Sequence, residues 1–530
     1  MSDAQRFADF RVGAVRPPRS PTLVKRIAEF LEAFPEASIH RQALQLLGSD
    51  WVFAAPDKKN PDCWTIYIRF GSVIENLFDI TREIVAYYSP YEDLQIRSFD
   101  RLERAVQLGT RSVTPDLRAL YSRDSANRKK VRDWAKGAVT TIPLDVNDTS
   151  VVEAAADLFS ILAEFLSTRD LYYETLPVTG EDFFGRRTLL LSLMRDIQEH
   201  RVCGVFGLRK SGKTSVVRQV MAALEESSDP WALAFVDLET LPSPPTDPIQ
   251  QLIKRVTYAL IQGLRPLQLR THELKQLDTN ASIESFAQAL KACLIDADRK
   301  SVKVLLALDE IEFLLAGDIN DSSRSNIAQF LAILRSLVQE HESFLILFSG
   351  LTSSIIESGR LFGRPNPLYS WAKPYFVTPL SAEDAQDLIV TLGGRMAVDW
   401  SPEAQEEVYT ETDGHAFYVR SLSSSVVKQL PPRQRLFRIE RELVQGVLRS
   451  WKRAEAARVR EIFETLEAYY PDERTLLDIA ISSPADLADI ADEHPTETEH
   501  LLNLGLLNEG QAGELSVSAI AQLNPARKQR

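Results

Sequence analysis

The chain has 530 residues, which is too long for one ordinary domain and favours three or four. Its formal net charge of −13 argues against a protein that coats nucleic acid regardless of sequence. No apolar stretch is long enough to span a bilayer. The three cysteines are too few and too scattered for a disulfide framework or a zinc site: Cys63, Cys203 and Cys293. With no apolar signal-peptide core near the start, these features predict a cytoplasmic protein.

Residues 1–150 are expected to form a separate small α/β domain, a sensor or an effector, because strand-like and helix-like segments alternate. The expected strands are 64–70, 83–88, 117–121 and 138–144, and the expected helices are 93–106 and 125–136. The second helix is basic. A solvated helix face is the favoured interpretation over a contact with nucleic acid or an acidic partner.

A degenerate nuclease site is an alternative interpretation of four acidic residues in this domain, Glu75, Asp79, Glu83 and Asp93. No lysine accompanies them at a convincing spacing, and the domain has no nucleophile triad or glycine-rich loop. The following segment, 151–180, is predicted to be an amphipathic connecting helix and a linker that ends in a Pro-Val-Thr-Gly turn.

The motif G-x-x-x-x-G-K-S/T is complete at residues 207–214, between a strand-like run at 202–206 and a helix-like run at 215–221. This strand–loop–helix context is what a phosphate-binding loop requires. It predicts that the ligand is a nucleoside triphosphate, ATP or its product ADP, bound with Mg²⁺.

Each position of this loop has an expected role. Gly207 and Gly212 let the backbone approach phosphate oxygens, and the N–H groups from Ser211 to Ser215 lack intrahelical acceptors and point at the anion. Lys213 is expected to reach the β- and γ-phosphates, and the hydroxyl of Thr214 to bind Mg²⁺.

A second half of the site is predicted about a hundred residues later. The apolar run 302–308 is interpreted as a buried parallel strand, and its carboxyl end lies where open α/β sheets bind ligands. Asp309 is expected to hold the Mg²⁺ shell, and Glu310 to orient and polarise the attacking water beside Lys213. A third strand, 344–348, leads to Ser349 and Thr352, which either reach the γ-phosphate or form only a polar turn.

An ATPase core at 181–380 is followed by a predicted helical lid at 381–450, which starts with Ser381 as an N-cap. His415 precedes a helix in this lid and either senses the phosphate or caps the helix. Residues 451–530 are predicted to form a winged-helix-like domain. Because residues 455–530 contain 15 acidic and six basic residues, this module is expected to repel a nucleic-acid backbone.

This ordered set of motifs resembles the STAND and archaeal-type ATPases, which are P-loop proteins related to the AAA+ class, over about residues 181–530. The resemblance implies that Phe184, Gly185 and Arg186 pack near the adenine and that His415 contacts the nucleotide from the lid. It also implies a switch that is closed with ADP, and often oligomeric with ATP.

The chain departs from the family pattern at two places. Ala416 stands where the family usually has proline, which weakens the expected lid contact. The Pro-Leu-Tyr element is followed by Ser370 and not by arginine, which leaves Arg360 and Arg364 as candidates for an arginine finger.

We therefore predict an α/β fold with a P-loop NTPase parallel sheet, a helical lid, a C-terminal winged helix and a separate N-terminal α/β domain. The leading functional hypothesis is a slow ATPase switch that acts through a protein partner or self-assembly, in signalling or anti-phage defence. One alternative is a DNA-acting AAA+ ATPase similar to origin-recognition proteins. The other is an ATPase-regulated effector with a degenerate nuclease or toxin N-terminal domain.

Overall fold

The computed structural model describes residues 21–523 except 58, 79, 81, 109–112, 135–139, 146–149, 167–169, 174–176, 240, 242–247, 279–280, 316–320, 363, 397, 431–436 and 511. The chain divides into two compact units. The first contains residues 1–173, 387–407 and 421–447, and the second contains residues 174–386, 408–420 and 448–530. No helix in the described part of the chain combines the length and the hydropathy that a membrane span requires.

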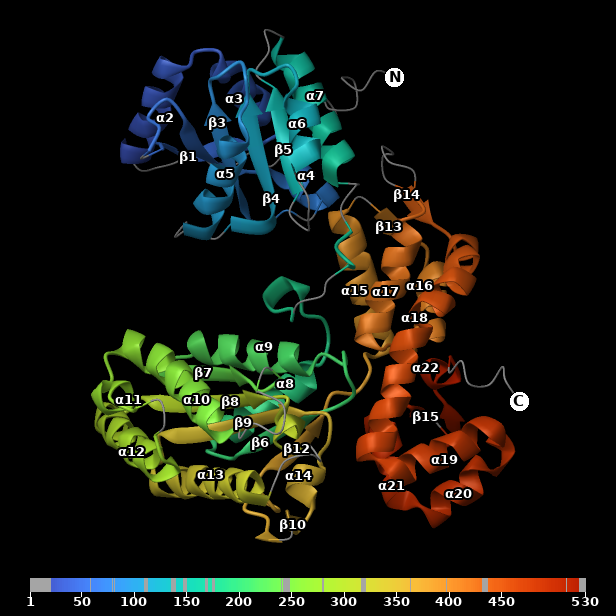
Figure 1. Cartoon of the computed structure of the whole chain (residues 1–530). Coiled ribbons are helices and arrows are strands. Elements are labelled where there is room, and N and C mark those ends of the chain that lie inside the picture. Colours follow the sequence, from blue (N-terminus) through green and yellow to red (C-terminus); the bar gives the residue numbers. More distant parts are fainter. Residues whose placement is uncertain are drawn as a thin grey trace. The chain divides into compact units, whose positions relative to one another are not determined.

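The first unit contains a mixed five-stranded sheet in the order β1-β2-β3-β4-β5 (Figure 1). Its strands are β1 (Asp50–Pro56), β2 (Trp64–Arg69), β3 (Glu83–Ser89), β4 (Val113–Ser122) and β5 (Thr140–Asp145). Strand β2 runs antiparallel to β1 and β3, whereas β3, β4 and β5 are parallel. This sheet agrees with the α/β character expected for residues 1–150, and β1 is a strand that the sequence had not revealed.

Helices cover both faces of this sheet. One apolar core joins it to α2 (Pro21–Ala33), α3 (Ala37–Leu46), α4 (Ser72–Phe78) and α7 (Val151–Leu166). A second core on the other face joins it to α5 (Ile96–Leu108) and α6 (Asn127–Trp134). The alternation of strands and helices in the sequence follows from this layering, because each face of the sheet needs an apolar cover.

The second unit is built on a parallel five-stranded sheet in the order β12-β6-β9-β8-β7. Its strands are β6 (Cys203–Phe206), β7 (Trp231–Asp237), β8 (Lys303–Asp309), β9 (Phe344–Gly350) and β12 (Lys373–Phe376). Strands β6 and β9 are buried at every position, because helices cover both faces of the sheet (Figure 1). The predicted parallel P-loop core is confirmed.

The helices of this core are α8 (Arg187–Gln198), α9 (Lys213–Glu225), α10 (Ile249–Leu264), α11 (His272–Lys275), α12 (Ile283–Lys300), α13 (Asp321–Glu340) and α14 (Ser354–Glu357). A short hairpin of β10 (Arg360–Leu361) and β11 (Arg364–Pro365) follows α14. Arg360 is exposed on this hairpin.

The lid contains α15 (Ala382–Arg395), α16 (Pro402–Thr412), α17 (Ala416–Val427) and a short parallel pair, β13 (Val398–Trp400) with β14 (Phe437–Ile439). The Ser381 hydroxyl accepts a 3.1 Å hydrogen bond from the backbone N–H of Asp384, so it caps α15 as expected.

The long helix α18 (Arg441–Tyr469) runs without interruption across residue 450, where a domain boundary was expected. No proline lies between its ends to stop the helix, so the lid and the C-terminal module share this element. The module continues with α19 (Pro471–Ser482), α20 (Leu487–Glu493), α21 (Pro495–Asn503), the hairpin β15 (Leu507–Glu509) and β16 (Leu515–Val517), and α22 (Ala519–Gln522). Three helices and a two-stranded wing form the predicted winged helix.

Candidate nucleotide-binding site

The phosphate-binding loop connects β6 to α9, and two of its glycines leave no room for a side chain. A Cβ on Gly207 would lie 2.9 Å from Ser211 Oγ. Gly212 has φ of 97°, and a Cβ there would lie 2.6 Å from a guanidinium nitrogen of Arg186. Helix α9 starts at Lys213, so its first N–H groups have no intrahelical acceptors and can bind an anion.

Two buried polar side chains make this loop fit a triphosphate. The ammonium group of Lys213, 3% exposed, donates a 3.1 Å hydrogen bond to the carbonyl of Leu208 within the loop. The hydroxyl oxygen of Ser211 is buried and has no hydrogen-bond partner among the described residues. A buried cation, an unpartnered hydroxyl and the start of a helix together match the needs of phosphate oxygens.

A candidate site for Mg²⁺ lies where α9, β8 and β9 meet. The hydroxyl of Thr214 donates a 2.7 Å hydrogen bond to Oδ2 of Asp309, and the hydroxyl of Ser349 donates to Oδ1 of the same carboxylate. Mg²⁺ prefers such hard oxygen donors and is usually held by one or two protein groups besides phosphate and water. Thr214 and Asp309 would hold the ion, which would supply positive charge to neutralise the phosphates when bound.

Glu310 follows β8 with φ of 57°, a left-handed conformation that is uncommon for a residue with a side chain. Burial, and then a hydrogen bond with Glu312, raise the pKa of Glu310 to about 8 against the opposing charge of Lys213. The segment after it is a 3₁₀ turn, Ile311–Leu315, and not the start of an α-helix. The charges of Lys213 and Arg209, both in the phosphate-binding loop, act on Glu310, so its carboxyl group lies near this loop.

Glu312 is part of the site although sequence reasoning missed it. Its carboxylate is 2% exposed, and its Oε2 accepts a 3.0 Å hydrogen bond from the backbone N–H of Leu351. A Cβ on Gly350 would lie 2.6 Å from this oxygen. The available signal was an acid two residues after Glu310 in an otherwise apolar stretch.

Arg186 lies against the phosphate-binding loop, where its guanidinium donates a 2.5 Å hydrogen bond to the carbonyl of Ser211. Burial lowers the pKa of Arg186 to about 10, and the charge of Asp384 opposes the shift. Gly185 has φ of 68°, and a Cβ there would meet the Asp384 carboxylate at 2.7 Å. Phe184, the remaining residue of this segment, is half-buried.

His415 precedes α17 and is 6% exposed. Neither ring nitrogen has a hydrogen-bond partner in the part of the chain that the structure describes. Burial, and then the positive charge of Arg186, lowers the pKa of His415 to about 3, so the ring is neutral. The lid thus brings His415 close to Arg186 and, through it, to the phosphate-binding loop.

The side chains of Ser215 and Thr352 are already engaged elsewhere. The Ser215 hydroxyl accepts a 3.1 Å hydrogen bond from the backbone N–H of Val178, which lies outside the phosphate-binding loop. Thr352 is fully buried and hydrogen-bonds with the side chain of Tyr470. Of the two candidates near the end of β9, Ser349 is therefore the one whose side chain contacts the candidate metal site.

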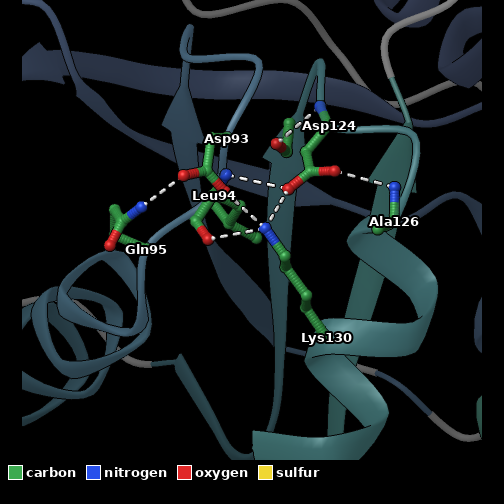
Figure 2. A network of polar contacts seen from close by, with 7 residues as sticks. Asp93, Leu94, Gln95, Asp124, Ala126 and Lys130 are labelled. Atoms are coloured by element: carbon green, nitrogen blue, oxygen red, sulfur yellow. Dashed lines mark hydrogen bonds and ion pairs between the residues drawn. The ribbon is translucent and has the colours of Figure 1, made fainter.

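A second polar cluster lies in the first unit, after the carboxyl ends of β3 and β4 (Figure 2). The ammonium group of Lys130 donates to Asp93 at 2.6 Å and to Asp124 at 2.7 Å. The Asp124 carboxylate also accepts hydrogen bonds of 2.8 Å from the backbone N–H groups of Leu94 and Ala126. Since Lys130 lies in α6 and Asp124 follows β4, this cluster fastens α6 to the sheet.

In the described part of the chain, two acids of the degenerate-nuclease hypothesis lie at opposite ends of one strand. Glu83 starts β3 and Asp93 follows its other end, whereas Asp79 lies outside the described residues. Among the described residues, no group of three or more His, Cys, Asp or Glu side chains is placed to hold a metal ion. Two basic residues of α6 pair with acids of α7: Arg128 with Asp157 and Arg132 with Glu164.

Comparisons with known proteins find one family model and several solved structures that are similar to part of this chain. The family model described as Novel STAND NTPase 1 matches residues 178–431. No curated protein matches the chain. Among solved structures, a Walker-type ATPase of Pyrococcus abyssi is 14% identical, with a TM-score of 0.49 over 67% of this chain and 99% of that one.

Two further solved structures are similar at low identity. The ORC2 protein of Aeropyrum pernix, solved with ADPNP and ADP, is 13% identical, with a TM-score of 0.41 over 68% of this chain and 95% of its own. The RuvB Holliday junction branch migration motor of Thermotoga maritima is 14% identical, with a TM-score of 0.32 over 66% and 96% of the two chains.

Proposed function

We propose that the protein is an ATP-driven molecular switch, on the basis that residues 178–431 match the family model of the Novel STAND NTPase 1 family. ATP and ADP would favour different arrangements of the lid and the C-terminal module on the core. Slow hydrolysis would return the protein to its resting state. The output would be binding of a protein partner or self-assembly, in signalling or anti-phage defence, with residues 1–150 as the sensing or transmitting part.

The observation that carries this proposal is that the phosphate-binding loop itself contacts the lid and α18. The guanidinium of Arg209, in the loop, forms an ion pair with Glu461 of α18. The ammonium of the next residue, Lys210, lies 4.3 Å from the centre of the Phe417 ring in α17. Because both residues are in the segment that surrounds phosphate, nucleotide binding acts directly on these contacts.

The test combines a binding-loop variant with a measurement of assembly. Lys213→Ala should abolish binding of a fluorescent ATP analogue, whereas Lys254→Ala, on an exposed face of α10, should bind normally. Mass photometry of the full chain with ADP, ATP and a non-hydrolysable analogue should show a nucleotide-dependent mass in the wild type and none in Lys213→Ala. Unchanged ATP affinity in Lys213→Ala would refute the proposal.

A DNA-acting ATPase is the second candidate, because the C-terminal module has the three helices and wing of a winged helix. Its acidic composition opposes this function. Titration of the protein with duplex DNA at low and high salt distinguishes a DNA-acting ATPase from the proposed switch. Affinity that falls steeply with salt would support a DNA-acting protein, and no affinity at low salt would eliminate it.

A further inference from the structure

Tyr470 connects the C-terminal module to the loop that follows β9. It lies between α18 and α19 and is 4% exposed. Its hydroxyl oxygen accepts a 3.1 Å hydrogen bond from the backbone N–H of Ser353, 117 residues earlier in the chain. The same hydroxyl lies 3.5 Å from the carbonyl oxygen of Leu351 and hydrogen-bonds with Thr352. One side chain therefore contacts three successive residues of this loop.

The loop 351–353 is directly joined to the metal site. Ser349, two residues before it, donates its hydroxyl hydrogen to Asp309. On the core side, the N–H of Leu351 donates to the buried carboxylate of Glu312. The loop is thus held by Glu312 from the strand β8 side and by Tyr470 from the C-terminal module.

A second contact fastens the same module next to this loop. The His500 ring of α21 packs against the Tyr470 ring, with centres 5.7 Å apart. One nitrogen of His500 lies 2.5 Å from Glu473 of α19, and the other lies 3.6 Å from Glu357 of α14, which follows the loop. The position of the Tyr470 hydroxyl therefore depends on how the whole module docks on the core.

We propose that Tyr470 is a positioning residue for nucleotide hydrolysis and acts through the loop 351–353. By fixing this loop, it aligns Ser349 with Asp309 at the place where the triphosphate and its water react. The proposal rests on the proposed function, since it assumes that the chain hydrolyses ATP. Under this proposal, the site is complete only while the C-terminal module is docked on the core. Hydrolysis slows when the module undocks from the core.

The variant Tyr470→Phe tests this, because it removes the hydroxyl and keeps the buried ring. In the full-length protein, the affinities for fluorescent ADP and ATP analogues should remain within about twofold of the wild type, whereas single-turnover hydrolysis should fall about tenfold. Hydrogen exchange should also change in nucleotide-free protein. The Ser353 amide loses its acceptor, so peptides that cover 349–353 should exchange faster.

Tyr258→Phe is the matched control, because Tyr258 is exposed on α10, and this variant should behave as the wild type in every assay. Faster loop exchange with unchanged hydrolysis would overturn the proposal by showing that Tyr470 only stabilises the module. Unchanged loop exchange would overturn it by showing that the contact does not hold the loop. A wild type that binds but never hydrolyses ATP would instead refute the ATPase function on which the proposal depends.

Discussion

The hydroxyl of Thr214 donates a 2.7 Å hydrogen bond to Oδ2 of Asp309, although 95 residues separate the two in the chain. The contact joins the start of α9 to the end of β8. It places an alcohol and a carboxylate, two oxygen ligands suited to Mg²⁺, beside the phosphate-binding loop. This pair turns two separate sequence motifs into one candidate site.

Replacing the carboxylate at this junction should weaken metal-dependent binding. In Asp309→Asn, the amide is a poorer ligand for Mg²⁺, so hydrolysis should fall about a hundredfold and need more Mg²⁺. A Mg²⁺ titration of hydrolysis and of fluorescent-nucleotide binding measures both effects. Asp237→Asn is the control, since Asp237 pairs in register with Asp309 at the end of neighbouring β7. Equal losses in the two variants would contradict a specific metal role.

Replacing the carboxyl group of Glu310 by an amide should separate binding from hydrolysis. Glu310→Gln retains the size of the side chain but cannot accept a proton from the attacking water, so hydrolysis should fall at least a hundredfold while ATP affinity changes less than about threefold. Equilibrium binding and single-turnover hydrolysis on the same preparation distinguish these quantities. A variant that hydrolyses ATP at the wild-type rate would remove Glu310 from the mechanism.

A methyl group at Gly350 should destabilise the second unit. In Gly350→Ala, the new Cβ would lie 2.6 Å from Glu312 Oε2 and 2.8 Å from Ile311 Cγ2, and such overpacking costs about 1–3 kcal/mol. Thermal unfolding should therefore begin at a lower temperature.

The control for this variant is Gly446→Ala in α18, where nothing lies within 4 Å of the added Cβ. Alanine is favoured over glycine inside a helix by about 0.5–1 kcal/mol, so this variant should unfold at the same or a higher temperature. If Gly350→Ala were as stable as Gly446→Ala, the side chains of Glu312 and Ile311 would have to move away from the added Cβ at no cost in stability.

The docking of α21 should weaken at alkaline pH. Hydrogen bonds with Glu357 and Glu473 raise the pKa of His500 to about 10, from an ordinary value of 6.5. Since the folded protein binds this proton more tightly, the contribution is fully present below pH 6.5 and is lost as the pH rises through 10. His500 also holds the pKa of Glu357 below its ordinary value of 4.5, so the pair weakens again in acid.

Thermal unfolding of wild type and His500→Gln across this range tests the linkage. The difference between their unfolding temperatures should be largest near pH 6 and should shrink steadily towards pH 10. His494→Gln is the control, because His494 is exposed and lies 4.0 Å from Glu497, a contact of small expected energy. A difference for His500→Gln that stays constant from pH 6.5 to 10 would contradict the assignment.

Much of the ATPase core could be predicted because apolar runs end directly in recognisable motifs. Strands β6, β8 and β9 were predicted for this reason. Strands β7 and β12 were not, since neither precedes a motif and β12 has only four residues. A domain boundary was predicted at residue 450, inside the continuous helix α18. Local composition cannot show that one helix serves both the lid and the winged helix.

The sequence by itself determined the ligand class, because the groups that bind phosphate lie within eight consecutive residues and act through local backbone geometry. Only the tertiary structure decided which distant residues join them. The sheet order places β9 between β6 and β8, which brings Ser349 to Asp309, and no local propensity encodes strand order. The lid contact of His415 and the loop contact of Tyr470 likewise depend on burial between elements that are remote in the chain.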